Sequence, residues 1–419
     1  MRKRVTSVLV AAVAAGLVAC GGGEAGSGST LTWFIFNEPS GVLTTLAERC
    51  SEQSNGRYRF SFEYLPSDAD SQREQLVRRL AAQDDTIDII GMDVIWTGEF
   101  ANAGWIRPVP RPIAQATTEG VFDSVLETAR FEDRLFGVPI CSNTQLLWYR
   151  EDRVRRAPQT WTEMIDRAEQ IGPQGTIQVQ ADRYEGLTVW ANAMIESAGT
   201  SIVTGPQDQQ IALEQPPTER ALALMGRLSR SPAAASDFST STEDTARLGF
   251  ESGDSTFMIN YPFVFPSAEE NAPEVAENIA AAKFPRVDPS IPSAPPLGGI
   301  NLGVSSYSQN PELAFEAIQC LVQPANQLDV AEQGGLPPVL SRLYDRPEIE
   351  EVYPGFADLI RESIQDAAPR PGSPAYQDLS LAVQRALHPT TQINPRDPTP
   401  TYQRLRERVE QAIERRGLL

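Results

Sequence analysis

The chain contains, at residues 87–105, the segment Ile87-Asp88-Ile89-Ile90-Gly91-Met92-Asp93-Val94-Ile95-Trp96-Thr97-Gly98-Glu99-Phe100-Ala101-Asn102-Ala103-Gly104-Trp105. The apolar, β-branched run that ends at Asp93 has the length of a buried strand, and an aromatic-rich helix with a glycine stop follows it. Ligands of open α/β sheets bind beyond the carboxyl ends of the strands, so Asp93 is well placed to bind a small polar molecule. Capping of the next helix by Asp93 is the alternative.

Strands and helices alternate before this segment. The pattern predicts strands at residues 31–36 and 58–64 and helices at residues 42–53 and 71–83. Such alternation predicts an α/β fold with a mainly parallel sheet and right-handed crossovers.

The pattern changes after Trp105. Residues 134–140 and 145–150 are strand-like, and the polar loop 141–144 between them is a natural crossing point from one lobe to another. The elements expected downstream are a helix that starts at Thr160, helices at 185–198, 218–228, 239–250 and 312–322, strands at 176–180, 255–260 and 298–305, a Pro-rich return linker at 285–296, and a helical tail from residue 347.

The N-terminus has the pattern of an export signal. Basic residues Arg2-Lys3-Arg4 precede an apolar run at residues 8–18 that is too short to span a membrane, and Leu17-Val18-Ala19-Cys20 has the form of a lipobox. We therefore expect residues 1–20 to be a lipoprotein signal peptide with Cys20 as the lipidated residue, followed by a flexible tether at residues 21–30. An ordinary secretory signal with an incidental cysteine is the alternative.

Length, charge and histidine content exclude several classes of function. A chain of 419 residues is long enough for two or more lobes, and its formal charge of −19 argues against binding to nucleic acid or anionic lipid. The single histidine, His388, precludes a histidine-based zinc cluster and leaves little room for a catalytic relay. Phosphate-binding motifs are absent from the sequence, so we expect no cofactor and no metal.

Three cysteines remain beside Cys20. Cys50 and Cys320 each lie late in a predicted amphipathic helix, whereas Cys141 lies in the predicted polar loop. In an exported protein a disulfide persists, and we expect Cys50 to pair with Cys320 and Cys141 to stay free. Spacing alone leaves open two buried, unpaired thiols instead.

The order of these elements resembles a known family. A lipobox, a first α/β lobe, a strand crossover, a second lobe and a return strand are typical of the extracellular solute-binding lipoproteins of ABC sugar importers, of the maltose-binding type. The resemblance narrows to the mycobacterial trehalose-binding lipoproteins of the LpqY-SugABC importer at the segments DVIWTGEF (93–100), NTQLLWYR (143–150), EGL (185–187), ARLGFE (246–251), NYPFVF (260–265) and GGLP (334–337).

The resemblance implies a two-lobed, periplasmic-binding-protein type II-like α/β fold with a hinge and a central ligand cleft. Lobe 1 would comprise residues 31–142 and 298–338, and lobe 2 would comprise residues 143–297 and 339–419. It also implies a monomer that is anchored through Cys20 to the outer face of the cell membrane. Such a protein captures trehalose and hands it unaltered to ABC permease subunits that work with a cytoplasmic ATPase.

The resemblance further implies a sugar site without catalytic residues. Carboxylates and amides suit a sugar because one such group engages two neighbouring hydroxyls. Motif by motif, the principal ligand-binding positions fall on Asp93, Asn143, Glu243, Tyr261 and Arg370, and further ligand-lining positions fall on Asn37, Glu38, Gln72, Gly335 and Leu336.

Two departures from the mycobacterial proteins keep other ligands in view. Tyr261 stands where those proteins have Trp, and a long insertion between Phe265 and Gly298 is missing. Another disaccharide or oligosaccharide, such as maltose, is therefore an alternative ligand. A secreted glycosidase that uses Asp93 with Glu243 or Glu251 is a further alternative.

Several of these side chains also have structural interpretations. Trp190 and Tyr261 are each either a sugar platform or a core residue, and Arg370 is either a ligand donor or part of a surface ion pair. The alternative role of Glu243, with Asp244, is to favour the N-terminus of a helix.

Overall fold

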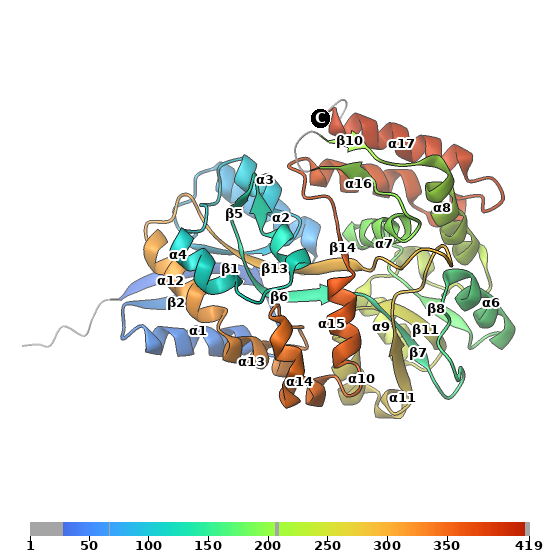
Figure 1. The fold of residues 1–419 in the computed structure, drawn as a ribbon, viewed down its shortest axis with the longest axis horizontal. Helices are drawn as coiled ribbons and strands as arrows, with labels where there is room; N and C mark the ends of the chain where they lie inside the picture. The colour runs from blue at the N-terminus through green and yellow to red at the C-terminus, as the bar shows by residue number, and fades with distance from the viewer. Residues whose placement is uncertain (1–27, 67, 206–208, 415–419) are drawn as a thin grey trace, which may run out of the picture.

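The structure, a computed structural model, describes residues 28–66, 68–205 and 209–414. The predicted signal peptide and Cys20 lie outside these residues. Two lobes lie side by side, with the start of the chain on the first and the end on the second (Figure 1). Each lobe is built on its own β-sheet, so the predicted α/β class and two-lobed architecture are confirmed.

The sheet of the first lobe has the strand order β14-β13-β3-β1-β2, and β6 also pairs with β13. Strand β1 is parallel to both β2 and β3, as expected, whereas β13 is antiparallel to β3 and β6, so the sheet is mixed. The strands are β1 (Ser29–Phe36), β2 (Tyr58–Leu65), β3 (Ile89–Asp93), β6 (Val138–Thr144), β13 (Pro296–Val304) and β14 (Ala368–Pro369).

Helices cover both faces of this sheet. In β1, Trp33 packs into the core beneath α1, while its neighbour Phe34 packs into the core on the opposite face. The helices of this lobe are α1 (Val42–Gln53), α2 (Ala69–Ala81), α3 (Thr97–Asn102), α4 (Arg111–Thr118), α12 (Pro311–Leu321) and α13 (Pro324–Gly334).

Cys50 of α1 is joined to Cys320 of α12 by the expected disulfide. Cys141 is a free, buried thiol. The bridge therefore ties the start of the first lobe to a helix that returns much later in the chain.

The second lobe has the strand order β12-β7-β11-β8. Its core is centred on α7, where Trp190 is fully buried between Trp161 and Phe238. The elements of this lobe are β7 (Leu146–Arg150), β8 (Thr176–Gln178), β11 (Ser255–Asn260), β12 (Ile279–Ala282), α6 (Trp161–Ile171), α7 (Glu185–Glu196), α8 (Gln215–Arg230), α9 (Glu243–Glu251), α10 (Val264–Asn271), α11 (Pro273–Ala276), α16 (Tyr376–Leu387) and α17 (Thr399–Ile413).

Three segments run between the lobes: β6 into β7, residues 283–295 from β12 into β13, and residues 370–375 from β14 into α16. Helices α14 and α15 lie beneath this crossing region in Figure 1. The smaller elements are α5 (Asp123–Thr128), α14 (Pro347–Val352), α15 (Ala357–Gln365), the hairpins β4 (Arg130–Phe131) with β5 (Arg134–Leu135) and β9 (Val203–Thr204) with β10 (Gln210–Ile211), and the 3-10 turns η1 (Phe238–Thr240), η2 (Ser341–Asp345) and η3 (Thr390–Gln392).

The lobes touch closely at Gly98 of α3. A Cβ atom at this position would lie 2.6 Å from the carbonyl oxygen of Gly372, in the segment that leads into α16. A second contact is a hydrogen bond of 2.9 Å from Nε2 of Gln377 in α16 to Oδ1 of Asp70 in α2. The first lobe is therefore held directly against the segment that enters the second.

Several predicted elements differ from the structure, and the strand predicted at 134–140 is divided into β5 and the start of β6. Residues 141–144 form the end of β6 rather than a polar loop, because Ser142 and Asn143 pair with Gly299 and Gly298 of β13. The helix predicted at 239–250 is divided into η1 and α9, since Thr242 caps a new helix by accepting a hydrogen bond from the backbone N–H of Thr245.

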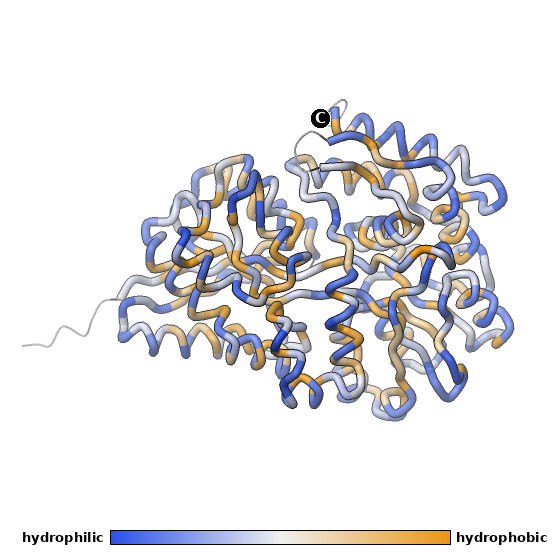
Figure 2. Tube along the Cα trace, viewed as in Figure 1, coloured by the Kyte–Doolittle hydropathy of each residue, from blue (hydrophilic) through white to orange (hydrophobic). Residues whose placement is uncertain are grey.

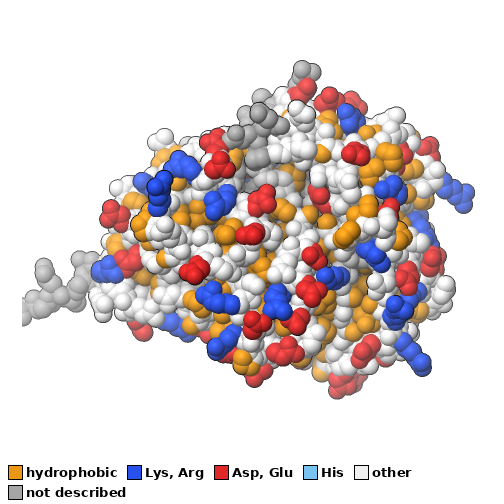
Figure 3. All heavy atoms as spheres, in the orientation of Figure 1, with side chains coloured by type: hydrophobic (Ala, Val, Ile, Leu, Met, Phe, Trp, Pro, Cys, Tyr) orange, Lys and Arg blue, Asp and Glu red, His pale blue; other side chains and the backbone are white. Residues whose placement is uncertain are grey.

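Apolar residues concentrate inside both lobes, and polar residues dominate their outer helices (Figure 2). On the face shown in Figure 3, acidic and basic side chains are interspersed. In the described ranges, no helix has the length and apolarity needed to cross a membrane.

Candidate functional site

A cavity of about 430 Å³ lies where the two lobes meet. Its walls come from the carboxyl ends of β3 and β11, the start of α2, the end of β6, and the segment after β14. It brings together seven of the predicted ligand positions: Gln72, Asp93, Asn143, Glu243, Tyr261, Leu336 and Arg370.

Asp93 is the last residue of β3. Its Oδ1 accepts a hydrogen bond of 3.2 Å from the backbone N–H of Ile95 and another of 3.0 Å from Nη2 of Arg370. The N-cap position of α3 is occupied by Trp96, so Asp93 does not cap that helix. Its Oδ2 accepts no hydrogen bond from the described residues, which leaves an acceptor for a ligand hydroxyl.

Arg370 is buried rather than part of a surface ion pair, with 5% of its surface exposed. Nη2 binds Asp93, and Nη1 donates a hydrogen bond to Oε1 of Glu185, the first residue of α7. Burial opposes the charged form, but the negative charges of Asp93 and Glu185 outweigh it and raise the pKa of Arg370 well above its usual value. Arg370 is therefore a permanent cation between two carboxylates.

Glu243 is the first residue of α9. Its position is fixed because Nδ2 of Asn260, the last residue of β11, donates a hydrogen bond of 3.0 Å to the Glu243 carbonyl oxygen. Burial raises the pKa of the Glu243 carboxyl, and a hydrogen bond from the Tyr184 hydroxyl opposes that rise. Glu243 therefore begins a helix, as the alternative interpretation predicted, and its side chain also lines the cavity.

Asn143 and Tyr261 approach one another over Gly298. A Cβ atom at Gly298 would lie 3.5 Å from Cβ of Asn143 and 3.8 Å from Cε1 of Tyr261. Burial, followed by the charge of Glu243, raises the pKa of Tyr261, so its hydroxyl keeps its proton. An amide and an aromatic face are thus adjacent on the cavity wall.

Three predicted positions do not line this cavity. Asn37 is exposed, and Glu38 uses its carboxylate locally, accepting hydrogen bonds from the backbone N–H groups of Ser40 and Val42 at the start of α1. Gly335, with φ +61°, ends α13 and lies against Phe263 and Pro266. Glu38 therefore supports the turn before α1.

The cavity also contains residues that the sequence did not single out as ligand positions. Glu185 and Tyr184 are the main ones; the resemblance at residues 185–187 was the only signal for Glu185, and Tyr184 had none. Cys141 lines the same cavity, and its burial raises the pKa of its thiol to about 12. Trp190, by contrast, is a core residue.

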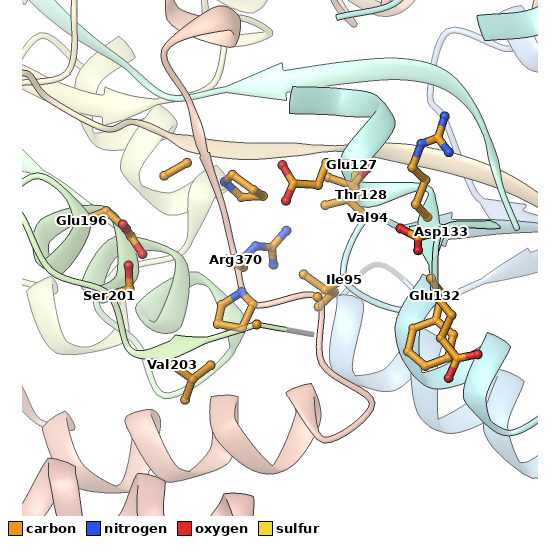
Figure 4. Close-up of a pocket in the computed structure, with 17 residues that line it drawn as sticks. Val94, Ile95, Glu127, Thr128, Glu132, Asp133, Glu196, Ser201, Val203 and Arg370 are labelled. Carbon is orange, nitrogen blue, oxygen red and sulfur yellow. The ribbon is translucent and has the colours of Figure 1, made fainter. Parts of the chain in front are cut away.

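A second cavity, of about 480 Å³, is lined in part by Arg370 (Figure 4), which also lines the first cavity. Glu196 and Ser201 face one another on one side of it, and Val94 and Glu127 lie on the other (Figure 4). Burial raises the pKa of Glu196 to about 7. The other carboxylates that line it are exposed, so the first cavity, with its buried polar side chains, is the better ligand site.

The described residues contain no group of three or more His, Cys, Asp or Glu side chains arranged to hold a metal ion.

The sequence matches the family of bacterial extracellular solute-binding proteins over residues 45–354. The chain belongs to this family. A probable ABC transporter-binding protein of Deinococcus radiodurans is 26% identical over 341 residues, which are 77% of this chain and 80% of the relative. As a member of the bacterial extracellular solute-binding proteins, the chain is extracytoplasmic.

Solved structures share the fold of this solute-binding protein. The maltose-bound MalE3 protein of T. maritima superposes with a TM-score of 0.82 at 23% identity, covering 92% of this chain and 99% of its own. A solute-binding protein of Thermotoga lettingae bound to α-D-tagatose gives a TM-score of 0.78 at 20% identity, covering 93% of this chain and 100% of its own.

Proposed function

We propose that this solute-binding protein is a lipoprotein of an ABC sugar importer that captures trehalose in the cavity between its lobes. It delivers the sugar unaltered to permease subunits and performs no catalysis. Asp93, Asn143, Glu243, Tyr261 and Arg370 bind the sugar, and Gln72 and Leu336 line the site. Cys20 carries the lipid anchor at the outer face of the membrane. Lobe 1 comprises residues 31–142 and 298–338, and lobe 2 comprises residues 143–297 and 339–419.

The observation that carries the proposal is the composition of the first cavity. Carboxylate, amide and aromatic groups from both lobes meet there, and the one guanidinium among them is already paired with two carboxylates. Such a site offers acceptors to sugar hydroxyls and repels anions. Its volume of about 430 Å³ is in the lower part of the usual range for small-molecule sites, which favours a disaccharide over a longer chain.

A second candidate is maltose. Tyr261 gives a smaller aromatic face than the Trp of the mycobacterial proteins, and the T. maritima protein of the same fold is bound to maltose. Both sugars are neutral disaccharides of glucose, so the proposed side chains suit either of them.

The test is calorimetric titration of the protein without residues 1–20. Trehalose, maltose and a phosphorylated disaccharide are added in turn, and NMR follows any release of glucose. We expect saturable binding of trehalose, no binding of the phosphorylated sugar and no glucose. Tighter binding of maltose would select the second candidate, and glucose release would favour a glycosidase.

The site is tested with Asp93→Ala and Glu243→Ala. Each change removes an acceptor and is expected to weaken binding by about tenfold or more, since hydrogen bonds to charged groups contribute about 1.5–3 kcal/mol. Glu251→Ala is the matched control, because Glu251 lies at the other end of α9 and pairs with Arg247. Unchanged affinity in both site variants would show that the sugar binds elsewhere.

A further inference from the structure

Helix α7 begins with a carboxylate that the proposed sugar site does not use directly. Glu185 has only 5% of its surface exposed. Its Oε1 accepts hydrogen bonds from Nη1 of Arg370 and from the hydroxyl of Tyr376, and its Oε2 accepts one of 2.6 Å from Oγ of Ser380. Three of the roughly four acceptor positions of this carboxylate are taken by protein donors, so Glu185 is largely committed to its protein partners.

Tyr376 and Ser380 lie four residues apart on α16, on one face of that helix. Together they hold the Glu185 carboxylate against α16, and the hydroxyl of Thr188, one turn further along α7, lies 2.9 Å from Oγ of Ser380. The Glu185 carboxylate is thus fixed within the second lobe, so Glu185 provides a rigid acceptor for Arg370.

Arg370 divides its two terminal nitrogens between the lobes. Nη1 is held by Glu185 of the second lobe, and Nη2 binds Oδ1 of Asp93, at the end of β3 in the first lobe. An arginine and a carboxylate often form a bidentate pair, in which two guanidinium nitrogens each bind one of the two carboxylate oxygens. Glu185 opposes that arrangement because its hold on Nη1 fixes the orientation of the guanidinium, in which only Nη2 reaches Asp93 and Nε has no hydrogen-bond partner among the described residues.

We propose that Glu185 is a positioning residue that holds Arg370 so that only one oxygen of Asp93 is consumed, leaving the other free for a sugar hydroxyl. The same arrangement links the two lobes through Arg370 where they meet. In the absence of the Glu185 charge, Arg370 turns to Asp93, forms the bidentate pair and removes the acceptor that the sugar needs.

This inference rests on the proposed function for its binding readout. The variant Glu185→Gln keeps the size of the side chain and removes its charge. The sugar that binds the wild type in calorimetry is titrated into it, and we expect affinity to fall about tenfold, a typical size for coupling between contacting residues. Glu196→Gln is the matched control, because it makes the same change in a partly buried carboxylate at the other end of α7.

The coupling is tested in a second background. In Arg370→Met protein, in which we expect weaker binding, Glu185→Gln is expected to cause no further loss. An equal loss in both backgrounds would mean that Glu185 acts through the general packing of α7 and α16, and no loss in either would mean that it does not act at all. Either result overturns the proposal.

A ligand-free measurement separates this proposal from the proposed function. Crystal structures of the wild type and of Glu185→Gln, both without sugar, are compared at Asp93. We expect Arg370 to contact one oxygen of Asp93 in the wild type and both oxygens in the variant. If the wild type binds no sugar at all, the proposed function fails, while this comparison still decides the role of Glu185. An unmoved Arg370 in the variant would refute it.

Discussion

The hydroxyl of Tyr184 lies 2.6 Å from Oε2 of Glu243. The two residues come from the starts of different helices, since Tyr184 precedes α7 and Glu243 begins α9. Burial and the negative charge of Glu243 raise the pKa of Tyr184, so the phenol keeps its proton and acts as the donor. The contact therefore fixes the direction of one of the proposed sugar-binding carboxylates.

Removal of that donor should weaken sugar binding. Tyr184→Phe leaves the Glu243 carboxylate free to rotate and is expected to reduce affinity by about tenfold, the lower end of the value of one hydrogen bond to a charged group, about 1.5–3 kcal/mol. Calorimetric titration measures the change. Tyr402→Phe serves as control, because the Tyr402 hydroxyl donates to the carbonyl oxygen of Leu213 in the core of the second lobe. Equal affinities for both variants and the wild type would contradict the prediction.

Glu196 should make folding stability depend on pH. Burial raises its pKa from 4.5 to about 7, so over that interval the folded state holds a proton that the unfolded state has lost. This contribution is fully present below pH 4.5 and disappears as pH rises through about 7. Glu196→Gln mimics the protonated form, so at about pH 8 it should be more stable than the wild type by about 1–2 kcal/mol, and at about pH 4 the two should be equal.

Urea denaturation at several pH values measures that difference. The exposed Glu63 provides the control, since Glu63→Gln makes the same chemical change on the surface of the first lobe. A stability gain for Glu196→Gln that does not vary with pH would rule out titration of Glu196 as its cause.

The disulfide should contribute to stability and not to binding. It closes a loop with a sequence separation of 270, so replacing both Cys50 and Cys320 by Ala is expected to lower the free energy of unfolding by about 2–5 kcal/mol. Sugar affinity should stay the same, because the bridge joins α1 and α12 and neither cysteine lines the cavity. Thermal unfolding with and without reductant tests the first expectation.

Labelling of thiols tests the pairing itself. In unfolded, unreduced protein without residues 1–20, only Cys141 should react with a maleimide. Reaction at Cys50 or Cys320 would refute the bridge.

Trp190 should be a stability residue. Its ring is fully buried and lies 6.0 Å from the rings of both Trp161 and Phe238, so Trp190→Ala is expected to cost about 3–5 kcal/mol. Trp190→Phe, which refills most of the space, should bind sugar as the wild type does. A large loss of affinity in the folded Phe variant would assign Trp190 to the sugar site after all.

Local sequence signals predicted the elements that depend on local chemistry. Helix α1 and strand β11 have the predicted bounds, because apolar spacing and turn residues define both. The helix predicted to start at Thr160 is α6; Thr160 caps it by accepting a hydrogen bond from the backbone N–H of Glu163, whose carboxylate accepts one from the backbone N–H of Gln159. Such features involve residues a few positions apart.

Structural features that depend on residues far apart in the sequence could not be predicted from local patterns. Strand pairing of Ser142 and Asn143 depends on glycines of β13, which lie far along the chain, so a polar composition there suggested a loop. In the same way, Arg370 and Glu185 are 185 residues apart, and no local pattern indicates that they meet. The resemblance brought Asp93, Glu243 and Arg370 to one site, but it did not indicate what holds them in place.

The contact of Gly98 with Gly372 has a consequence for how the halves come together. The space between them has no room for a methyl group, since a Cβ atom would lie 2.6 Å from a carbonyl oxygen. The added methyl group of Gly98→Ala should hold the two lobes further apart. Small-angle scattering should then report a larger radius of gyration. We expect this variant still to fold and to reach the importer, but to release its ligand more readily because its lobes do not close fully.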